Sequence, residues 1–405
     1  MSAFVIFVAI LSVASSGATV QKLAVLNTEF GLAIYKQLTA DPEVKDIFFS
    51  PISISTALVM LQLGTNGTTE DQINRAMKFD TLSQNENVAA LFRDLNAKLN
   101  NASNNYTLKS ANRFFGSKRF PFRQTFLSDM RDYFNAEPES VDFMANPEGS
   151  RVHINDWVGN QTDDKIKELM AKGTVTKSTV FVLANAIYFK GQWNMSFNST
   201  MTSSLPFRSK GQEAKVSMMK MLGQTHRYGI STKWNCQILE LPYTGNVSML
   251  VFLPNEPDGL PQLESAINSI ELNSLVKNLT KRPVDVYLPR FELKDVSIKL
   301  ADHLKKLGMT DMFVDGKADL SGIGGAPGQL FISTAVHQAY VKVDEEGTEA
   351  GAATASGGAA AMRPQEFKAD HPFMFMIRDN ITETILFLGR LHEAPRKSDT
   401  TLRFN

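Results

Sequence analysis

The chain has 405 residues, of which 43% are hydrophobic and 21% charged, the proportions of an ordinary globular protein. Lysine plus arginine and aspartate plus glutamate number 42 each, so the net charge is zero. This balance excludes a general electrostatic attraction for nucleic acid or for an anionic membrane. The length allows two or three domains, or one large one.

The N-terminal segment is apolar but short. Residues 4–13 form an apolar run that cannot span a bilayer, and small residues follow it. This pattern predicts a secretion signal, residues 1–18, that signal peptidase removes. No later segment is long and apolar enough to cross a membrane, so we expect a soluble mature protein in the extracellular space.

Secretion would make the Asn-x-Ser/Thr triplets candidate sites for glycans. The best candidates, Asn101 and Asn105, lie in a polar run. The other matching positions are Asn66, Asn160, Asn194, Asn198, Asn246, Asn278 and Asn380. Any of these that lies inside a strand is expected to stay bare.

The single cysteine, Cys236, cannot form an internal disulfide. It lies in a run of alternating apolar residues, which predicts a buried and inert thiol. An intermolecular disulfide is the alternative. Stability must therefore come from the core.

Apolar spacing near 3.6 residues predicts helices in the first part of the chain. They cover residues 21–39, 52–63, 87–99, 122–134 and 152–158. Later in the chain, short helices are expected over 260–279 and a further helix over 297–308.

One long apolar run, residues 178–193 with Asn185 in its middle, predicts a strand that is covered on both faces. Further strands are predicted at 107–115, 215–221, 236–243, 248–254, 284–293 and 329–343. No repeat and no break in composition divides the chain. We therefore expect one large α/β domain over residues 19–392 and a polar, disordered tail over 393–405.

The residue types of a catalytic or metal site are present but scattered. There is no H-E-x-x-H pair, no G-x-S-x-G elbow and no phosphate-binding loop. The histidines show no ligand spacing; they are His153, His226, His303, His337, His371 and His392. A hydrolase has no positive support, and we predict neither a cofactor nor a metal.

The segment 341–361 is the most unusual part of the chain. It opens with a β-type pattern, passes through acidic residues and continues with alanine, glycine, serine and threonine as far as Met362. Composition alone fits a flexible linker, or an alanine-rich helix that each glycine weakens by about 1 kcal/mol. Neither interpretation explains why apolar strand sequences lie on both sides of it.

Several stretches resemble one known family, the serpins or serine protease inhibitors. The hinge of their reactive-centre loop resembles EEGTEAGAATA at 345–355, and the signature after that loop resembles HPFMFMI at 371–377. Their second helix resembles IFFSPISISTALVMLQLG at 47–64, and the helix across their main sheet resembles VHINDWVGNQTDDKI at 152–166. The resemblance implies an α+β serpin fold: a large, mostly antiparallel central sheet, two further sheets, eight or nine helices and an exposed loop at about 345–370.

The resemblance also implies roles for single residues. The hinge matches Glu345, Gly347, Thr348, Glu349, Ala350, Gly351, Ala352 and Ala353. A polar cluster beneath the central sheet, the shutter, matches Ser50, Ser53, Asn185 and His337. The contacts at the top of that sheet, the breach, match Trp193, Arg290 and Glu345. Arginine at position 290 replaces the commoner lysine and changes the geometry of the donor.

The bond that a protease would cut is placed by loop length. The family's usual spacing from Gly347, and from Pro372 backwards, gives Ala361–Met362. A small residue there suits an elastase-like protease. Arg363 would suit a trypsin-like protease, but it requires a longer hinge and precedes a proline. Cleavage after Met362 is the third choice.

The function that the resemblance implies is inhibition, not catalysis. A secreted, invertebrate-type inhibitor would be cleaved once by a serine protease, insert its hinge into the central sheet and hold the protease as a covalent acyl complex. The alternative is a non-inhibitory carrier or storage serpin, whose hinge is typically bulky or charged.

The predicted partner is the protease alone, and the protein is predicted to be a monomer. Heparin-binding serpins concentrate basic residues on the helix that corresponds to 87–99. Here that helix has only Arg93 and Lys98, so strong heparin binding is not expected.

Overall fold

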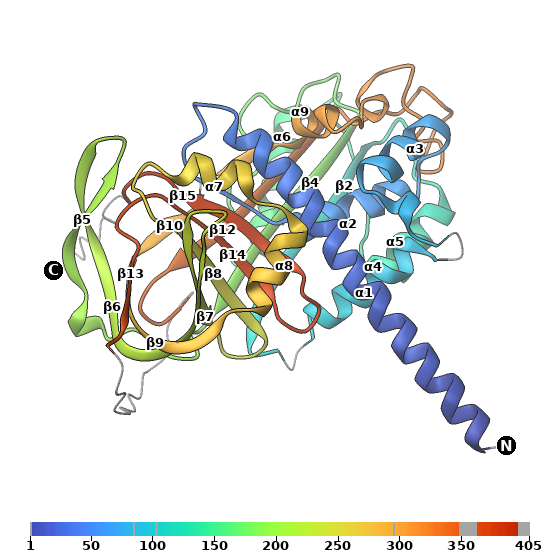
Figure 1. Cartoon of the computed structure of the whole chain (residues 1–405). Coiled ribbons are helices and arrows are strands. Elements are labelled where there is room, and N and C mark those ends of the chain that lie inside the picture. The colour runs from blue at the N-terminus through green and yellow to red at the C-terminus, as the bar shows by residue number, and fades with distance from the viewer. Residues whose placement is uncertain (1, 84–85, 102–103, 295, 348–362, 396–405) are drawn as a thin grey trace.

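Two β-sheets and nine helices make up the part of the chain that the computed structural model describes, which omits residues 1, 84–85, 102–103, 295, 348–362 and 396–405 (Figure 1). The helices are α1 (Ser2–Thr39), α2 (Pro51–Gln62), α3 (Gly67–Ala76), α4 (Val88–Leu99), α5 (Gln124–Phe134), α6 (Pro147–Gln161), α7 (Leu260–Ala266), α8 (Ser269–Lys277) and α9 (Leu300–Lys306). The strands are β1 (Ile47–Phe49), β2 (Tyr106–Ser117), β3 (Glu139–Val141), β4 (Phe181–Gly191), β5 (Ser203–Ser209), β6 (Gln212–Ser231), β7 (Cys236–Pro242), β8 (Val247–Pro254), β9 (Thr280–Pro289), β10 (Phe291–Leu293), β11 (Ser297–Lys299), β12 (Thr334–Val343), β13 (Gln365–Lys368), β14 (Phe373–Asp379) and β15 (Ile385–Leu391).

The central sheet contains the strands that matter for function. Its order is β10-β12-β4-β2-β3, with β11 also paired to β12. The neighbours β4 and β12 run parallel, with Thr334 opposite Val182 at one end and Tyr340 opposite Tyr188 at the other. We call this parallel pair the seam. Every residue of β4 except Lys190 is buried, because packed layers cover both faces of the sheet.

The second sheet has the order β1-β15-β14-β8-β7-β6-β9-β13, with β5 paired to β6. The sequence predicts two further sheets, and the long strand β6 joins them into one. Its register with β9 shifts between Met221 and Gln224, where Gly223 has a φ of +65°. A bulge of this kind redirects a strand, so the first half of β6 pairs with β5 and the second half with β7.

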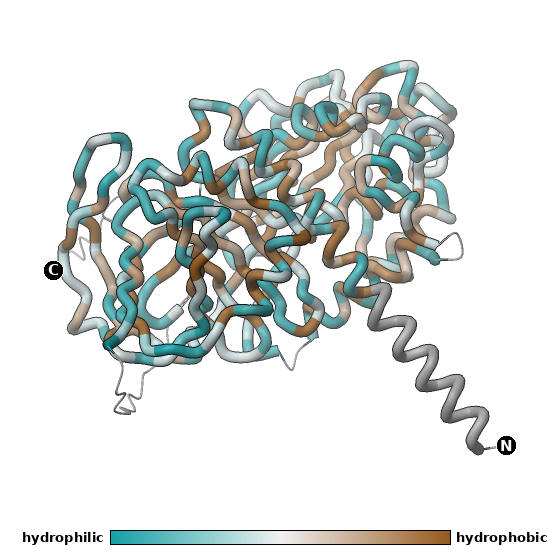
Figure 2. Tube along the Cα trace, viewed as in Figure 1, coloured by the Kyte–Doolittle hydropathy of each residue, from teal (hydrophilic) through white to brown (hydrophobic). Residues whose placement is uncertain are grey.

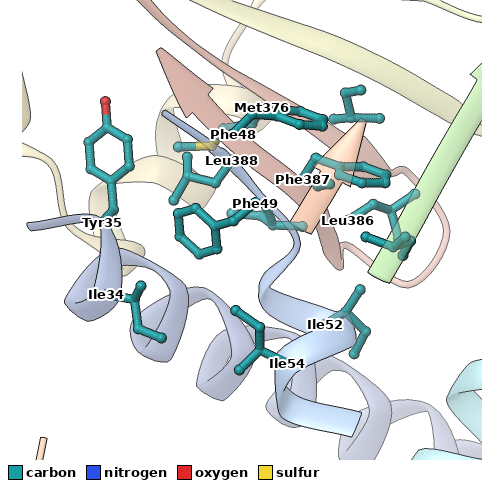
Figure 3. Close-up of a cluster of buried hydrophobic side chains, with 14 of the residues drawn as sticks. Ile34, Tyr35, Phe48, Phe49, Ile52, Ile54, Met376, Leu386, Phe387 and Leu388 are labelled. Carbon is teal, nitrogen blue, oxygen red and sulfur yellow. The ribbon is translucent and has the colours of Figure 1, made fainter. Parts of the chain in front are cut away.

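Helix α2 is buried along almost its whole length, because apolar and small residues surround it on all sides. The Ser50 side chain caps the helix by accepting from the Ser53 backbone N–H, and Pro51 occupies the first turn. Figure 3 shows Ile54 of this helix in a cluster with Phe48 and Phe387, and all three side chains are fully buried. The two phenylalanine rings stack with centroids 5.0 Å apart. This packing fixes α2 against β15 and β4, and so beneath the seam.

Helix α6 and the segment after it cover the opposite, outer face of the seam. Ile154, Val158 and Ile166 belong to a second apolar core that also includes alternate residues of β2, β4 and β12. The segment is tied back to the helix, since the Asn155 side chain exchanges hydrogen bonds of 3.0 and 2.8 Å with the backbone of Met170. Figure 2 shows apolar residues along the strands between the layers and hydrophilic ones over the outer loops. The seam is therefore held between two apolar layers.

Most predicted elements are confirmed, and the differences have local causes. The run 284–293 forms two strands, because after Pro289 the chain leaves its partner β6 and continues as β10 on β12. The segment 297–308 starts as the short strand β11 before α9 begins. Helix α6 begins before residue 152, at Pro147, where the Asn146 side chain caps it. The sequence patterns miss helix α3, the short strands β1, β3, β5 and β13, and the buried strand β15 altogether.

Helix α1 is continuous from Ser2 to Thr39, and its first half extends away from the body (Figure 1). The predicted helix from residue 21 onwards is confirmed, with Leu23, Phe30 and Tyr35 buried. No helix among the described residues combines the length and the apolarity needed to cross a membrane.

Candidate functional site

A row of polar side chains crosses the seam in the middle of its otherwise apolar inner face. His337 on β12 lies opposite Asn185 on β4, which in turn lies opposite Asn112 on β2. The Asn185 amide nitrogen donates to the Ser53 carbonyl at 3.1 Å and also to Asn112 Oδ1. The Ser53 hydroxyl donates to the same Asn112 oxygen at 3.3 Å. These hydrogen bonds connect β4 and β2 to helix α2. We call these four residues, together with Ser50, the shutter cluster.

The geometry around His337 defines its tautomer. The Ser50 backbone N–H donates to His337 Nε2 at 3.0 Å, so that nitrogen must be the acceptor. The proton therefore lies on Nδ1, which donates to Asn185 Oδ1. Burial lowers the pKa of His337 to about 3, because the charged imidazole would lose its hydration. The imidazole is thus neutral. Its Nδ1 binds across the seam to Asn185, and its Nε2 ties β12 to the start of helix α2.

We predict that replacing His337 with glutamine changes how stability depends on pH. In the unfolded chain this histidine takes up a proton near its ordinary pKa of about 6.5, whereas in the folded protein it does not. His337 therefore contributes a loss of about 1.4 kcal/mol in the free energy of unfolding per pH unit as pH falls from about 6.5 towards 3. The variant lacks this term, so urea unfolding at pH 7.5, 6.0 and 5.0 should show a shallower loss than in the parent. Equal slopes in the two proteins would contradict the neutral, buried state.

The resemblance names four of the five shutter residues, and the structure brings all four together. Asn112 is the one shutter residue that was not predicted from the sequence. Like Asn185, Asn112 is an asparagine in the middle of a predicted strand, here the strand at 107–115. Only the register between β2 and β4 places it against Asn185.

At the breach, the buried carboxylate of Glu345 accepts hydrogen bonds from two side chains. Arg290 binds Glu345 through Nε and Nη2, with N–O distances of 2.6 and 2.5 Å, and the Thr202 hydroxyl donates to the other carboxylate oxygen. Burial by itself opposes ionisation of Glu345, but the hydrogen bonds from Arg290 and Thr202 outweigh it and hold the pKa below its ordinary value. Glu345 therefore stays charged and anchors the start of the hinge. Thr202 lies in an irregular segment, and no sequence pattern points to it.

Trp193 covers the same end of the seam. Its backbone N–H donates to Glu346 O at 2.9 Å, and its indole N–H donates to Asp344 O at 3.0 Å. Its ring stacks on Tyr243 with a centroid distance of 4.3 Å. The tryptophan thus holds the backbone on which the hinge begins.

The hinge leaves the seam through a turn at residues 344–347, in which Asp344 and Gly347 exchange backbone hydrogen bonds of 3.0 and 3.3 Å. Gly347 has a φ of +127°, and a Cβ there would lie 2.3 Å from the Gly191 carbonyl oxygen and 2.7 Å from the Trp193 nitrogen. Only glycine allows this conformation and this close approach. The turn therefore rests directly on the end of β4.

Most of the predicted loop lies outside the described residues: Thr348, Glu349, Ala350, Gly351, Ala352, Ala353, Ala361 and Met362. Arg363, the alternative specificity residue, is exposed just before β13. The described parts thus place the start of the loop at Gly347 on the seam. The last part of the predicted loop is not exposed throughout, because Gln365–Lys368 form β13 on β9 and Phe367 is buried.

All nine candidate glycosylation asparagines are exposed, and none lies inside a strand. On helix α4, Arg93 pairs with its neighbour Asp94 at 2.9 Å, while Lys98 is exposed.

Cys236 is buried on β7, and burial raises the pKa of its thiol to about 12, so it stays protonated. Within the described residues no group of three or more histidine, cysteine, aspartate and glutamate side chains could hold a metal ion.

Comparison with known proteins decides the family. The family description of the serpins, serine protease inhibitors, matches residues 25–394. The chain belongs to the serpin family. This serpin is 42% identical over 379 residues to a leukocyte elastase inhibitor of Equus caballus, covering 91% of this chain and 99% of the relative. It is 41% identical over 370 residues to a leukocyte elastase inhibitor of Xenopus laevis, covering 90% and 97%.

Solved structures agree with the assignment. Uncleaved ovalbumin has a TM-score of 0.83 at 33% identity, covering 92% of this serpin and 99% of that chain. Serpin48 of the insect Tenebrio molitor has a TM-score of 0.82 at 33% identity, covering 92% and 98%. Human thyroxine-binding globulin, in complex with thyroxine, has a TM-score of 0.84 at 29% identity, covering 93% and 100%. The serpin fold predicted from the sequence is confirmed, and so is the predicted assignment to the serine protease inhibitors and not to an enzyme family.

Proposed function

We propose that this serpin is a single-use inhibitor of an elastase-like serine protease, cut at Ala361–Met362. One observation carries the proposal: the hinge begins at the end of β12, and β12 forms one side of the parallel seam. Once the loop is cut, its hinge therefore starts beside β4 and β12, the two strands between which it can insert. The relatives named leukocyte elastase inhibitor support the choice of protease, as does a small residue at position 361.

The trapping step uses the chemistry of the protease. Its serine hydroxyl attacks the carbonyl of Ala361, the Ala361–Met362 bond breaks, and an ester forms while the Met362 amine leaves with a proton. Normally water then hydrolyses that ester. Insertion of the hinge into the seam carries the attached protease away from its binding position before hydrolysis takes place, so the complex persists.

The composition of the hinge suits this movement. Alanine and glycine lose little or no side-chain entropy when a strand forms, and their small size lets them pass between strands that have only partly separated. A charged side chain entering the sheet would lose several kcal/mol of hydration, and the sequence has no charge between Glu349 and Arg363. The hinge is therefore able to insert quickly.

Mixing the protein with neutrophil-type elastase, and separately with trypsin, tests the proposal. We expect a complex with elastase that resists SDS, and a released C-terminal peptide whose mass corresponds to a start at Met362. A peptide that starts at Pro364 and a complex with trypsin would support the alternative through Arg363. Cleavage without a complex for either enzyme would overturn inhibition.

We further propose that the protein is secreted as a glycosylated monomer after removal of residues 1–18. The family match starts only at residue 25, and the first half of α1 extends away from the body, which supports a removable leader. The exposed sequons support glycosylation. Protein recovered from the medium of cells expressing the full chain should start near residues 17–19 and lose mass on treatment with an N-glycosidase. Retention inside the cells with an intact N-terminus would contradict this. An invertebrate-type member stays a prediction.

The second candidate function is that of a non-inhibitory carrier. The similarity to thyroxine-binding globulin in complex with thyroxine favours considering it. The uncharged residues between Glu349 and Arg363 count against it, since the family's non-inhibitory hinges are typically bulky or charged.

A further inference from the structure

Two tyrosines face each other across the seam, on the side covered by helix α6 and the segment after it. Tyr188 on β4 lies directly opposite Tyr340 on β12, and the ring centroids are 5.7 Å apart at an angle of 60°. Only 1% of Tyr188 and 5% of Tyr340 is exposed. Edge-to-face rings at this distance attract each other beyond the effect of burial alone.

A lysine lies over both rings. The ammonium nitrogen of Lys165, in the segment after α6, is 5.9 Å from the centroid of Tyr188 and 5.7 Å from that of Tyr340. A cation shared by two aromatic faces favours the arrangement in which those faces are adjacent. Lys165 therefore attracts one strand on each side of the seam at the same time.

One tyrosine is also held on its own side of the seam. The Tyr340 hydroxyl donates to Glu292 Oε1 of β10 at 2.9 Å. If a new strand separates β4 from β12, Tyr340 stays with β10 while Tyr188 stays with β4. The two rings must then part, and Lys165 can no longer lie over both.

The tyrosine pair lies at the hinge end of the seam. In the ladder it is the pair furthest from Thr334, whereas the shutter pair of His337 and Asn185 lies three residues deeper. The turn at Gly347 rests on the end of β4 nearest to the tyrosines. A strand that enters from the hinge must therefore separate the tyrosines before it reaches the shutter cluster.

We propose that Tyr188, Tyr340 and Lys165 form a clasp that closes the hinge end of the seam and sets the rate at which a strand enters it. This inference rests on the proposed function. It adds three positioning residues that an entering strand meets before it reaches the shutter cluster. The clasp stabilises only the closed sheet, because insertion parts the two rings and Lys165 can no longer lie over both of them.

Uptake of a synthetic peptide tests the clasp without any protease. The peptide has the sequence of residues 348–361, and its rate of entry into the intact protein is followed by a shift on native gels. Lys165→Met keeps the unbranched stem but removes the charge, and Tyr340→Val removes the ring. We expect uptake to accelerate about threefold in the first variant and about fivefold in the second.

Two matched variants serve as controls. Tyr340→Phe keeps the ring pair and loses only the hydroxyl, so its uptake rate should stay near that of the parent. Lys167→Met removes an exposed charge two residues further on and should also leave the rate unchanged. In the peptide-loaded form, Lys165→Met should have the same melting temperature as the parent, because the clasp is already open there.

The outcomes separate the clasp from the proposed function. A parent that takes up peptide at the same rate as Lys165→Met and Tyr340→Val would overturn the clasp alone. A Lys165→Met variant that melts lower in the loaded form as well as in the unloaded form would show a merely structural lysine, and would also overturn it. A parent that takes up no peptide would overturn strand insertion itself, and the proposed function with it.

Discussion

Replacing Thr348 with arginine is expected to convert the serpin from an inhibitor into a substrate. Thr348 follows Gly347, so it must be among the first residues to enter the seam after cleavage. A guanidinium there would lose several kcal/mol of hydration on entering the sheet. Insertion would then be slower by about a hundredfold, which lets water hydrolyse the acyl ester first. On SDS gels with elastase, the variant should give cleaved protein in place of the covalent complex.

A matched variant makes this test specific. Thr348→Ser keeps a small, uncharged side chain at the same position and should still form the complex. The rate at which elastase cuts the loop should be similar in all three proteins, because position 348 is far in sequence from the bond at Ala361. An arginine variant that traps elastase as well as the parent does would contradict hinge insertion.

Cutting the loop is expected to raise the melting temperature of the parent by 10 °C or more, on the order of what several additional kcal/mol of stability produce. Before cleavage, β4 and β12 pair directly with each other. After cleavage, the hinge can pair with both strands, and the trapped intact form relaxes to a more stable one. Calorimetry before and after limited proteolysis of the loop measures the change.

This measurement also separates the two candidate functions. A carrier whose loop does not insert would melt at the same temperature before and after the cut. Cleaved Thr348→Arg should show a smaller rise than the cleaved parent, because its hinge cannot enter fully. A large rise in the parent together with an equal rise in the arginine variant would mean that insertion does not begin at the hinge.

The sequence predicts those features that depend on long, regular patterns. The apolar run around Asn185 is long enough to identify a strand that is covered on both faces, and the family resemblance brings in His337 and the serines below it. Short strands such as β1 and β3 have too few residues to show any period. They are defined only by the partner that they meet in the folded protein.

The remaining differences between the predicted and the observed elements arise where one stretch of sequence pairs with strands in both sheets. At Arg290 the chain passes from one sheet to the other, so a single apolar run is divided between β9 and β10. Asn112 and the pair of Tyr188 and Tyr340 depend on register, which a single sequence does not fix. The contacts that close the seam are therefore visible only once the strands are aligned.

The parallel arrangement of β4 and β12 decides the direction of the strand that would join them. The loop follows β12 in the chain, after the turn at residues 344–347, so once it folds back into the sheet beside β12 it has to run opposite to β12. Since β4 points the same way as β12, the newcomer runs opposite to both. One parallel ladder would then be exchanged for two antiparallel ones, which are the slightly more stable kind. The connectivity of the chain thus makes the exchange favourable and leaves no alternative orientation.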